Sequence, residues 1–287
     1  TRAAVESEER REDKLLPPAP KAASHVTVIR PDATDRLEYR IHSDDLATGG
    51  PKAKYAANTH AIRTLKQIEQ ENRLASADEQ EILAKYVGWG GLASAFDEHD
   101  DSWTKEYHEL KDLLTDEEYS SARESTLNAH YTSPVIIREM FRAIEGLGFR
   151  TGNVLEPSCG IGNFYGCVPD SMHNSKFYGV ELDSLTGRIG QQLYQKANIA
   201  IQGFEKSSLP DSFFDLAIGN IPFGSYKIAD PRYDKYGFMV HDYFFAKTID
   251  KVRPGGVIAF VTSKGTMDKQ SPAVRKYIAE KCELLGA

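Results

Sequence analysis

The spacing of apolar residues along the chain changes once, near residue 127. Before that point, apolar positions recur at helical spacing. The pattern predicts helices at about 58–71, 76–86, 103–113 and 116–124. After that point, a predicted helix at 134–147 leads into short apolar runs that alternate with helical stretches. The predicted strands lie near 154–155, 176–182, 199–204, 214–219 and 257–262.

Strands that alternate with helices predict a parallel sheet with helices on both faces, so the second part of the chain is expected to be an α/β fold. We therefore expect a flexible leader over 1–40, a small helical domain over 41–126 and an α/β domain over 127–287. The leader is charged and then rich in proline, with a short strand candidate at 26–29. The chain begins without methionine and stops after an apolar run, so we expect the sheet to be cut before its last strands.

Composition and charge limit the cellular location and the binding partners expected for this chain, but they do not identify its function. The 287 residues carry a net charge of −7 with a pI of about 5.7, which argues against strong DNA binding by the piece alone but permits a local basic face. The apolar runs are only strand-sized, and the first residues lack the apolar core of a signal peptide, so no membrane association is expected. Three cysteines without a paired spacing favour a cytoplasmic location.

A glycine- and tryptophan-containing segment and the histidines of the chain show no pattern that indicates a catalytic or metal-binding role. Gly88-Trp89-Gly90-Gly91 has no lysine or acidic partner nearby, and we interpret it as a packed turn. The eight histidines are scattered without metal-ligand spacing, so no metal site is predicted.

A predicted strand leads through a glycine-rich turn into a helix near residue 160. Gly160 and Gly162 would let the backbone approach a ligand that side chains would block. A dinucleotide fingerprint needs a third glycine where Tyr165 stands, and no P-loop Lys-Ser/Thr pair follows. With dinucleotide and P-loop binding disfavoured, the turn suits a small ligand that has an amino-acid end and an adenosine end. S-adenosylmethionine is such a ligand. Glu156 would take its ammonium group, and Pro157 belongs to the same turn. A turn built for tight packing explains the glycines equally well.

Two acidic residues follow the second predicted strand. Glu181 ends that strand about 20 residues after the glycine turn, the place from which an acid accepts hydrogen bonds from ribose hydroxyls. Asp183 is a weaker choice because it can cap the helix that begins near Ser184. Asp242 is likewise expected to cap a later helix.

The tetrapeptide Asn220-Ile221-Pro222-Phe223 follows the fourth predicted strand. The amide oxygen of Asn220 and the carbonyl of Ile221 can accept both N–H groups of an exocyclic amine. Pro222 stiffens the turn, and the ring of Phe223 can stack on a planar base. The alternative is an ordinary asparagine-containing turn after a buried strand.

Taken together, these motifs resemble the amino-methyltransferases whose cofactor motif precedes the catalytic motif. Segments 88–91, 128–133 and 203–205 look more closely like the adenine methyltransferase segment of very large methyltransferase–helicase proteins carried by bacterial conjugative elements and phages. This resemblance implies a Rossmann-like, S-adenosylmethionine-dependent fold that methylates adenine N6 in double-stranded DNA after flipping the base. It also implies helicase-like and target-recognition regions elsewhere in the full-length chain.

The resemblance implies further cofactor residues. In many methyltransferases an acid after the third strand meets the adenine amino group, whereas Gly203 stands there in this sequence. Glu205 would then serve the amino group and Phe204 would flank the ring, although core packing explains Phe204 nearly as well. The loop with Tyr131 and Thr132 would close over the methionine part of the cofactor, while Thr132 or Ser133 caps the helix that starts at Pro134. Ile221 departs from the family's proline, yet only its carbonyl is required.

The leading hypothesis is direct methyl transfer to adenine N6 of DNA. RNA adenine, cytosine N4 and a glutamine side-chain amide also present an sp2-attached amine and remain alternatives. A non-catalytic cofactor-binding or scaffold module of a larger helicase protein is a further alternative.

Overall fold

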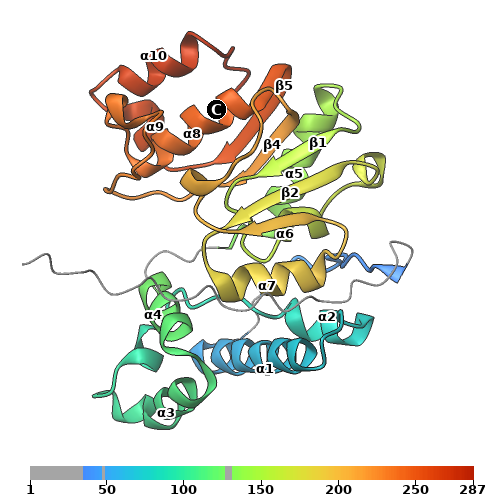
Figure 1. Cartoon of the computed structure of the whole chain (residues 1–287), viewed down its shortest axis with the longest axis vertical. Coiled ribbons are helices and arrows are strands. Elements are labelled where there is room, and N and C mark those ends of the chain that lie inside the picture. The colour runs from blue at the N-terminus through green and yellow to red at the C-terminus, as the bar shows by residue number, and fades with distance from the viewer. Residues whose placement is uncertain (1–34, 47–48, 127–130) are drawn as a thin grey trace, which may run out of the picture.

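Five parallel strands form the centre of the computed structural model, which describes residues 35–46, 49–126 and 131–287 (Figure 1). The strand candidate at 26–29 and residues 128–130 lie outside the described residues. The strands are β1 (Asn153–Glu156), β2 (Lys176–Glu181), β3 (Asn198–Ile201), β4 (Phe214–Asn220) and β5 (Val252–Val261). Their order is β3-β2-β1-β4-β5, so the direction of winding reverses between β1 and β4. The predicted Rossmann-like α/β fold is confirmed.

The two faces of the sheet are covered by different helices because successive strand residues point to opposite sides. Val154 and Leu216 belong to the core on one face, whereas Leu155 and Ala217 belong to the core on the other. The first face packs against α5 (Pro134–Gly146), α6 (Asn163–Gly166) and α7 (Ser184–Leu193). The second face packs against α8 (Val240–Lys251) and α10 (Ala273–Ala279).

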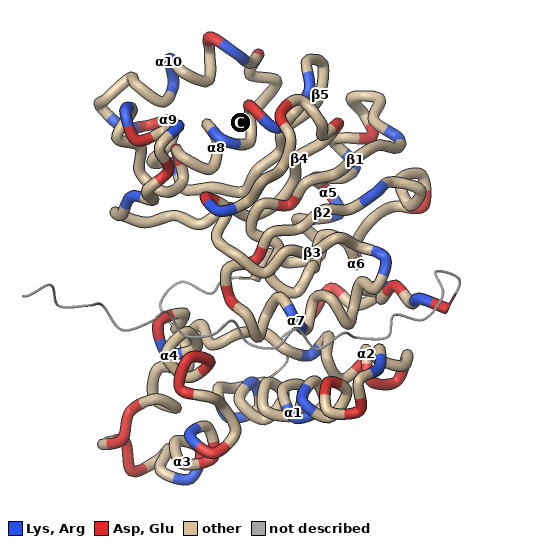
Figure 2. The backbone as a smooth tube through the Cα atoms, viewed as in Figure 1, with Lys and Arg blue, Asp and Glu red and all other residues tan. Residues whose placement is uncertain are grey.

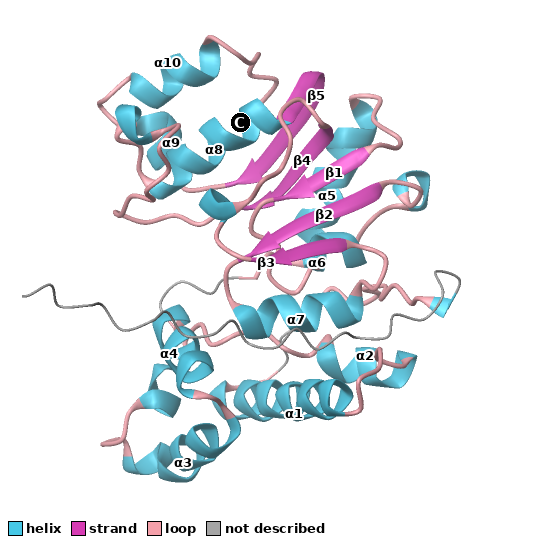
Figure 3. Ribbon diagram, in the orientation of Figure 1, coloured by secondary structure: helices cyan, strands magenta, loops and turns pink. Residues whose placement is uncertain are grey.

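The expected helices before the sheet are present (Figure 3). They are α1 (Pro51–Gln70), α2 (Ala77–Leu83), α3 (Thr104–Leu113) and α4 (Asp116–Ser125). Helices α1, α2 and α4 contact α7, whereas α3 packs on α1 and α4. The first begins earlier than predicted, because Pro51 suits a first helical turn. Ser76 and Glu79 form the predicted capping box of α2. Trp89 is buried and packs its ring on Phe96 with centroids 5.2 Å apart, which confirms a packed turn.

Helices α1–α4 and the sheet share one core. Buried apolar residues of α1 such as Ile62 belong to the same cluster as Ile189 of α7 and Ile218 of β4. Polar contacts reinforce this junction: Arg188 of α7 forms ion pairs with Glu69 and Glu118. Whether residues 41–126 constitute a separate domain stays a prediction, but their packing depends on the sheet.

Three local predictions need correction. The third strand ends at Ile201, and 204–206 form a short 3-10 helix instead of its last residues. Ser133 occupies the cap position of α5 with Pro134 in its first turn, but the Ser133 side chain makes no capping hydrogen bond. The prediction for Asp242 is wrong, because Met239 occupies the cap position and the Asp242 carboxylate is buried in an ion pair with Lys269.

Shorter elements complete the path of the chain. The 3-10 helices are η2 (Ala93–Phe96), η3 (Asp101–Trp103), η4 (Asp170–Met172), η5 (Phe204–Lys206) and η6 (Asp234–Tyr236), and one turn of α-helix forms α9 (Gly265–Asp268). Within the described ranges, no helix is both long enough and apolar enough to cross a membrane.

The turn after β1 requires glycine at position 162, and a substitution there can test this requirement. Gly162 has φ of +91°, and a Cβ added to it would lie 2.6 Å from the ring of Tyr194. We expect Gly162→Ala to lower the free energy of unfolding by about 1–3 kcal/mol, from left-handed strain and overpacking together. Chemical denaturation measures the change. Gly146→Ala at the end of α5, where an added Cβ would meet nothing within 4 Å, is the control and should be neutral or slightly stabilising. An equal loss in both variants would contradict this account.

Candidate functional site

Three of the predicted functional residues meet at one edge of the sheet. Glu156, Glu181 and Asn220 are the last residues of β1, β2 and β4. Because β1 lies between β2 and β4 and all three strands are parallel, their carboxyl ends are adjacent. This edge includes the point between β1 and β4 where ligands of open α/β sheets bind.

The turn after β1 connects two of the predicted elements. Gly160 is in the left-handed conformation with φ of +56°, and its N–H donates to Oε2 of Glu181 at 2.8 Å. A Cβ on Gly160 would lie 3.5 Å from the Tyr131 ring, so the ring packs over the turn. Pro157 is buried in the same turn. The packing interpretation accounts for Gly162, which lies against Tyr194, whereas Gly160 lies beside the predicted cofactor residues.

Glu156 is a buried carboxyl group. Its side chain is 2% exposed, and its Oε2 atom has no hydrogen-bond partner among the described residues. Burial raises the pKa of Glu156 well above its usual range, and the nearby Glu181 carboxylate raises it further. Gly219 of β4 makes room for it, since a Cβ there would lie 3.1 Å from Cγ of Glu156. A buried acidic oxygen of this kind is suited to receiving a cationic donor.

Glu181 is held in one orientation by backbone donors. Oε1 accepts from the Asp183 N–H and Oε2 from the Gly160 N–H, each at 2.8 Å. Burial raises the pKa of Glu181 to about 7, although these two hydrogen bonds lower it. Asp183 itself caps α7 by accepting from the Thr186 N–H at 2.7 Å, as the alternative prediction for it stated.

In the segment after β3, the side chain of Glu205 lies over Gly203. The Glu205 carboxylate lies so close to Gly203 that a Cβ there would overlap it. Glycine at 203 therefore leaves space for the acid supplied two residues later. Phe204 is 3% exposed, with its ring centroid 5.0 Å from that of Phe244 on α8. This contact fits core packing, and flanking of an adenine ring by Phe204 stays a prediction.

The structure gives a reason for isoleucine, instead of proline, at position 221 of the tetrapeptide. Ile221 is buried in the core on the α8 side, and its N–H donates to the carbonyl of Val261 at 3.2 Å. Proline at 221 could not make this hydrogen bond. Pro222 is half-buried, and Phe223 is 42% exposed. Phe223 thus presents a partly exposed aromatic ring beside the end of β4.

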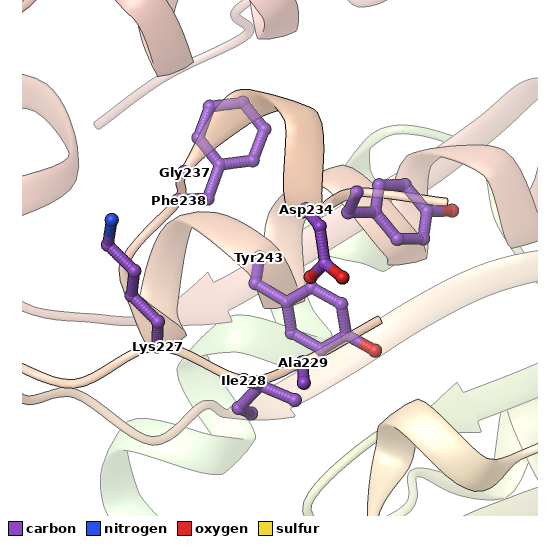
Figure 4. A pocket seen from close by; sticks show the side chains of 8 residues that line it. Lys227, Ile228, Ala229, Asp234, Gly237, Phe238 and Tyr243 are labelled. Carbon is purple, nitrogen blue, oxygen red and sulfur yellow. The ribbon is translucent and has the colours of Figure 1, made fainter. Parts of the chain in front are cut away.

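A hollow of about 330 Å³ lies in the loop that follows the tetrapeptide (Figure 4). It is lined by Lys227, Ile228, Ala229, Tyr233, Asp234, Gly237, Phe238 and Tyr243. None of the predicted cofactor residues lines it, so it is distinct from the edge formed by β1, β2 and β4. A second hollow of about 830 Å³ lies among η2, α3 and α4.

Sequence patterns missed a residue that reaches the site from another element. Ser121 of α4 donates through Oγ to Oδ2 of Asp183 at 2.6 Å. Ser121 belongs to no motif, because this contact joins segments that are distant in the sequence. Lys264 lies three residues after Val261, the last residue of β5, which is paired with Asn220.

Comparisons with known proteins agree with the methyltransferase resemblance at the level of class. No protein-family model matches the chain. The chain is 27% identical over 237 residues to the "defense against restriction protein B" of Escherichia phage P1, covering 80% of this chain and 9% of the phage protein. It is 33% identical over 104 residues to the type II methyltransferase M.CvrRI of Paramecium bursaria Chlorella virus XZ-6E, covering 36% of this chain and 26% of that protein. The chain thus spans only a minor part of either relative.

Solved structures give partial overlays. One is a proposed class I S-adenosylmethionine-dependent methyltransferase from Listeria monocytogenes, 15% identical, with 80% of each chain covered and a TM-score of 0.44. Another is the modification subunit of a proposed type I restriction enzyme from Vibrio vulnificus YJ016, 19% identical, with 62% of this chain and 43% of that chain covered and a TM-score of 0.44. The fold assignment rests on the strand order and not on these overlays.

The raised pKa of Glu181 can be measured directly. We expect its carboxyl carbon to titrate in NMR spectra near pH 7, against an ordinary value of 4.5, with Glu181→Gln assigning the signal. Because the folded pKa exceeds the unfolded one, the stabilising effect of protonated Glu181 is complete below about pH 4.5 and is lost as pH rises through 7. The stability of wild type relative to Glu181→Gln should therefore fall over that window. Titration near pH 4.5 would disprove the burial argument.

Proposed function

We propose that this chain is an S-adenosylmethionine-dependent methyltransferase that acts on the N6 amino group of adenine in DNA. The observation that carries the proposal is the grouping of Glu156, Glu181 and Asn220 at adjacent strand ends beside the reversal of the sheet. The carboxyl groups suit the ammonium and ribose of the cofactor, and the amide suits a planar amine. Similarity to a viral type II methyltransferase and to a phage protein named for defence against restriction supports a DNA substrate.

The residues present fit this cofactor. Glu156 has a buried oxygen without a partner among the described residues, and the donors of an ammonium group would satisfy it. Each oxygen of Glu181 accepts one backbone N–H and retains a lone pair for a ribose hydroxyl. Tyr131 covers the turn at Gly160 and would limit the access of water. Thr132 is half-buried in the same loop and stays a predicted contact for the methionine part.

The other end of the site would hold the base. When bound, S-adenosylmethionine would supply an electrophilic methyl group. N6 would bond to that carbon as the sulfur–methyl bond breaks and the neutral thioether leaves, and the methylated nitrogen would then release one hydrogen as a proton to solvent. The Asn220 amide oxygen and the Ile221 carbonyl oxygen would each accept a hydrogen bond from one N6–H group. These hydrogen bonds would increase the electron density on the nitrogen. Phe223 would stack on a base flipped out of the duplex. Positioning and electrostatics would then supply most of the catalysis.

The segment that follows the tetrapeptide has a positive net charge, which supports a nucleic-acid substrate; Figure 2 shows its Lys and Arg interspersed with Asp and Glu around α8, α9 and α10. Residues 221–281 contain eleven Lys and Arg against six Asp and Glu, a net charge of +5 in a chain whose total is −7. Lys227 and Lys264 are exposed, and no ion pair within the described ranges involves either one. Their ammonium groups are therefore available to phosphates. Because the chain matches only 9% of its phage relative, we propose that helicase-like and target-recognition regions lie elsewhere in the full-length protein.

Substitution in the tetrapeptide tests the assignment. With labelled S-adenosylmethionine and adenine-containing duplex DNA, we expect Asn220→Ala to lower kcat by roughly 10²- to 10³-fold, as loss of one preorganised polar group does. Phe223→Ala should lower kcat/KM by the equivalent of about 1–3 kcal/mol, the range for stacking on one base. Phe213→Ala is the matched control, because it removes a partly exposed phenylalanine just before the start of β4, at the opposite edge of the sheet.

Nucleoside analysis of the product decides the substrate. N6-methyladenine would support the proposal, whereas N4-methylcytosine or methylated RNA would overturn the base or polymer while leaving the reaction class intact. Full activity of Asn220→Ala would remove the tetrapeptide from catalysis.

The charged segment generates a separate prediction. Combined Lys227→Ala and Lys264→Ala substitution should weaken DNA binding and reduce the slope of log K against log salt by roughly one to two, one for each lost phosphate contact. Cofactor binding should stay unchanged. The control replaces Arg150 and Lys176 by alanine, which removes the same charge at the opposite, amino-terminal edge of the sheet. Equal effects of both pairs would mean that net charge, and not this face, determines binding.

A further inference from the structure

We infer that the helical region before the sheet is part of the cofactor site, because Ser121 of α4 positions the acid Glu181 through Asp183. The inference rests on the proposed function, in which Glu181 holds the ribose of the cofactor. It assigns a role to helices α1–α4, for which the motifs of the sheet gave none.

A continuous chain of hydrogen bonds runs from α4 to the glycine turn. Ser121 Oγ donates to Oδ2 of Asp183 at 2.6 Å. The Asp183 N–H donates to Oε1 of Glu181 at 2.8 Å, and Oε2 of Glu181 accepts from the Gly160 N–H at 2.8 Å. Every link involves a carboxylate, and hydrogen bonds to charged groups are the stronger kind. The orientation of Glu181 is therefore connected to the position of α4.

Asp183 is fixed from two directions. Its Oδ1 accepts from the Thr186 N–H at 2.7 Å, which caps α7, while Oδ2 is held by Ser121. The cap alone leaves the carboxylate free to pivot about Oδ1, because a single hydrogen bond sets one oxygen only. The second bond removes that freedom and with it the freedom of the Asp183 peptide that donates to Glu181.

Helix α4 is itself anchored where Ser121 needs it. Glu118 lies one helical turn before Ser121, on the same side of α4. It forms an ion pair with Arg188 of α7 and a second with Lys66 of α1, the latter at 2.8 Å. These pairs hold α4 against α7 at the level of the capping aspartate. Ser121 is thus a positioning residue, whose hydroxyl acts on the cofactor only through Asp183 and Glu181.

The acidic surroundings give the Ser121 hydroxyl a second effect. Burial raises the pKa of Glu181, and the negative charge of Asp183 raises it further; a hydroxyl donor that satisfies Oδ2 keeps the Asp183 carboxylate in place. Loss of the donor would let Asp183 move, and the pH at which Glu181 loses its proton would change. This gives a readout that a purely structural role in α4 would not affect.

The test measures binding of S-adenosylmethionine to the whole chain by calorimetry between pH 5.5 and 7.5. We expect Ser121→Ala to weaken binding by about 3- to 10-fold, part of what one hydrogen bond to a charged group provides. The pH midpoint of binding should also shift relative to wild type. Ser121→Thr, which retains the hydroxyl, should restore both, and DNA affinity should be unchanged in each variant.

Ser120→Ala is the matched control, since Ser120 is the preceding residue of α4 and its side chain is exposed, with a 3.5 Å contact to Glu124. Wild-type affinity and midpoint in Ser121→Ala, or an equal loss in Ser120→Ala, would overturn the inference while the proposed function stands. Absence of cofactor binding by wild type would overturn the proposed function itself. Thermal unfolding of each variant confirms that the compared proteins are folded.

Discussion

The free-energy cost of a buried carboxyl group is the constraint on which this site depends. A carboxylate without a partner in a protein interior is strongly unfavourable, so such a group is neutral or receives a cation. Glu156 is in this situation at the end of β1, with Gly219 opposite it and Glu181 close enough to raise its pKa. The charge of Glu181 opposes the ionisation of Glu156, and a cationic ligand would offset that repulsion. The edge of the sheet is therefore prepared for a positively charged molecule before one arrives.

The rest of the molecule holds this edge in place. Pairing of β1 with both β2 and β4 brings the two acids and Asn220 together, and the left-handed glycine at 160 directs a backbone N–H toward Glu181. Beyond the sheet, α7 is both the helix that Asp183 caps and the surface on which α1 and α4 pack. Support for the site thus extends continuously from the sheet into the preceding helices.

Much of the fold was predictable from the sequence because its signals are local. Apolar runs of strand length identified all five strands, and the acid that ends β2 was identified by its distance from the glycine turn. Predictions failed where tertiary contacts outweigh local preference. Asp242 is of a residue type that often caps helices, but it forms an ion pair with Lys269. The 3-10 helix η5 replaces the end of the predicted third strand, because Phe204 packs on α8. The contact of Ser121 with Asp183 joins residues 62 positions apart, and no periodicity reports such a pair.

The core shared by α1, α7 and β4 has a consequence for how this protein can be divided. A cut near residue 127 would leave the strands intact but would expose the apolar side of α7. It would also remove both acidic partners of Arg188 and the Ser121 hydroxyl that donates to the capping Asp183. An exposed apolar face favours self-association over independent folding. We therefore expect gene fusion or recombination to transfer the helices together with the sheet.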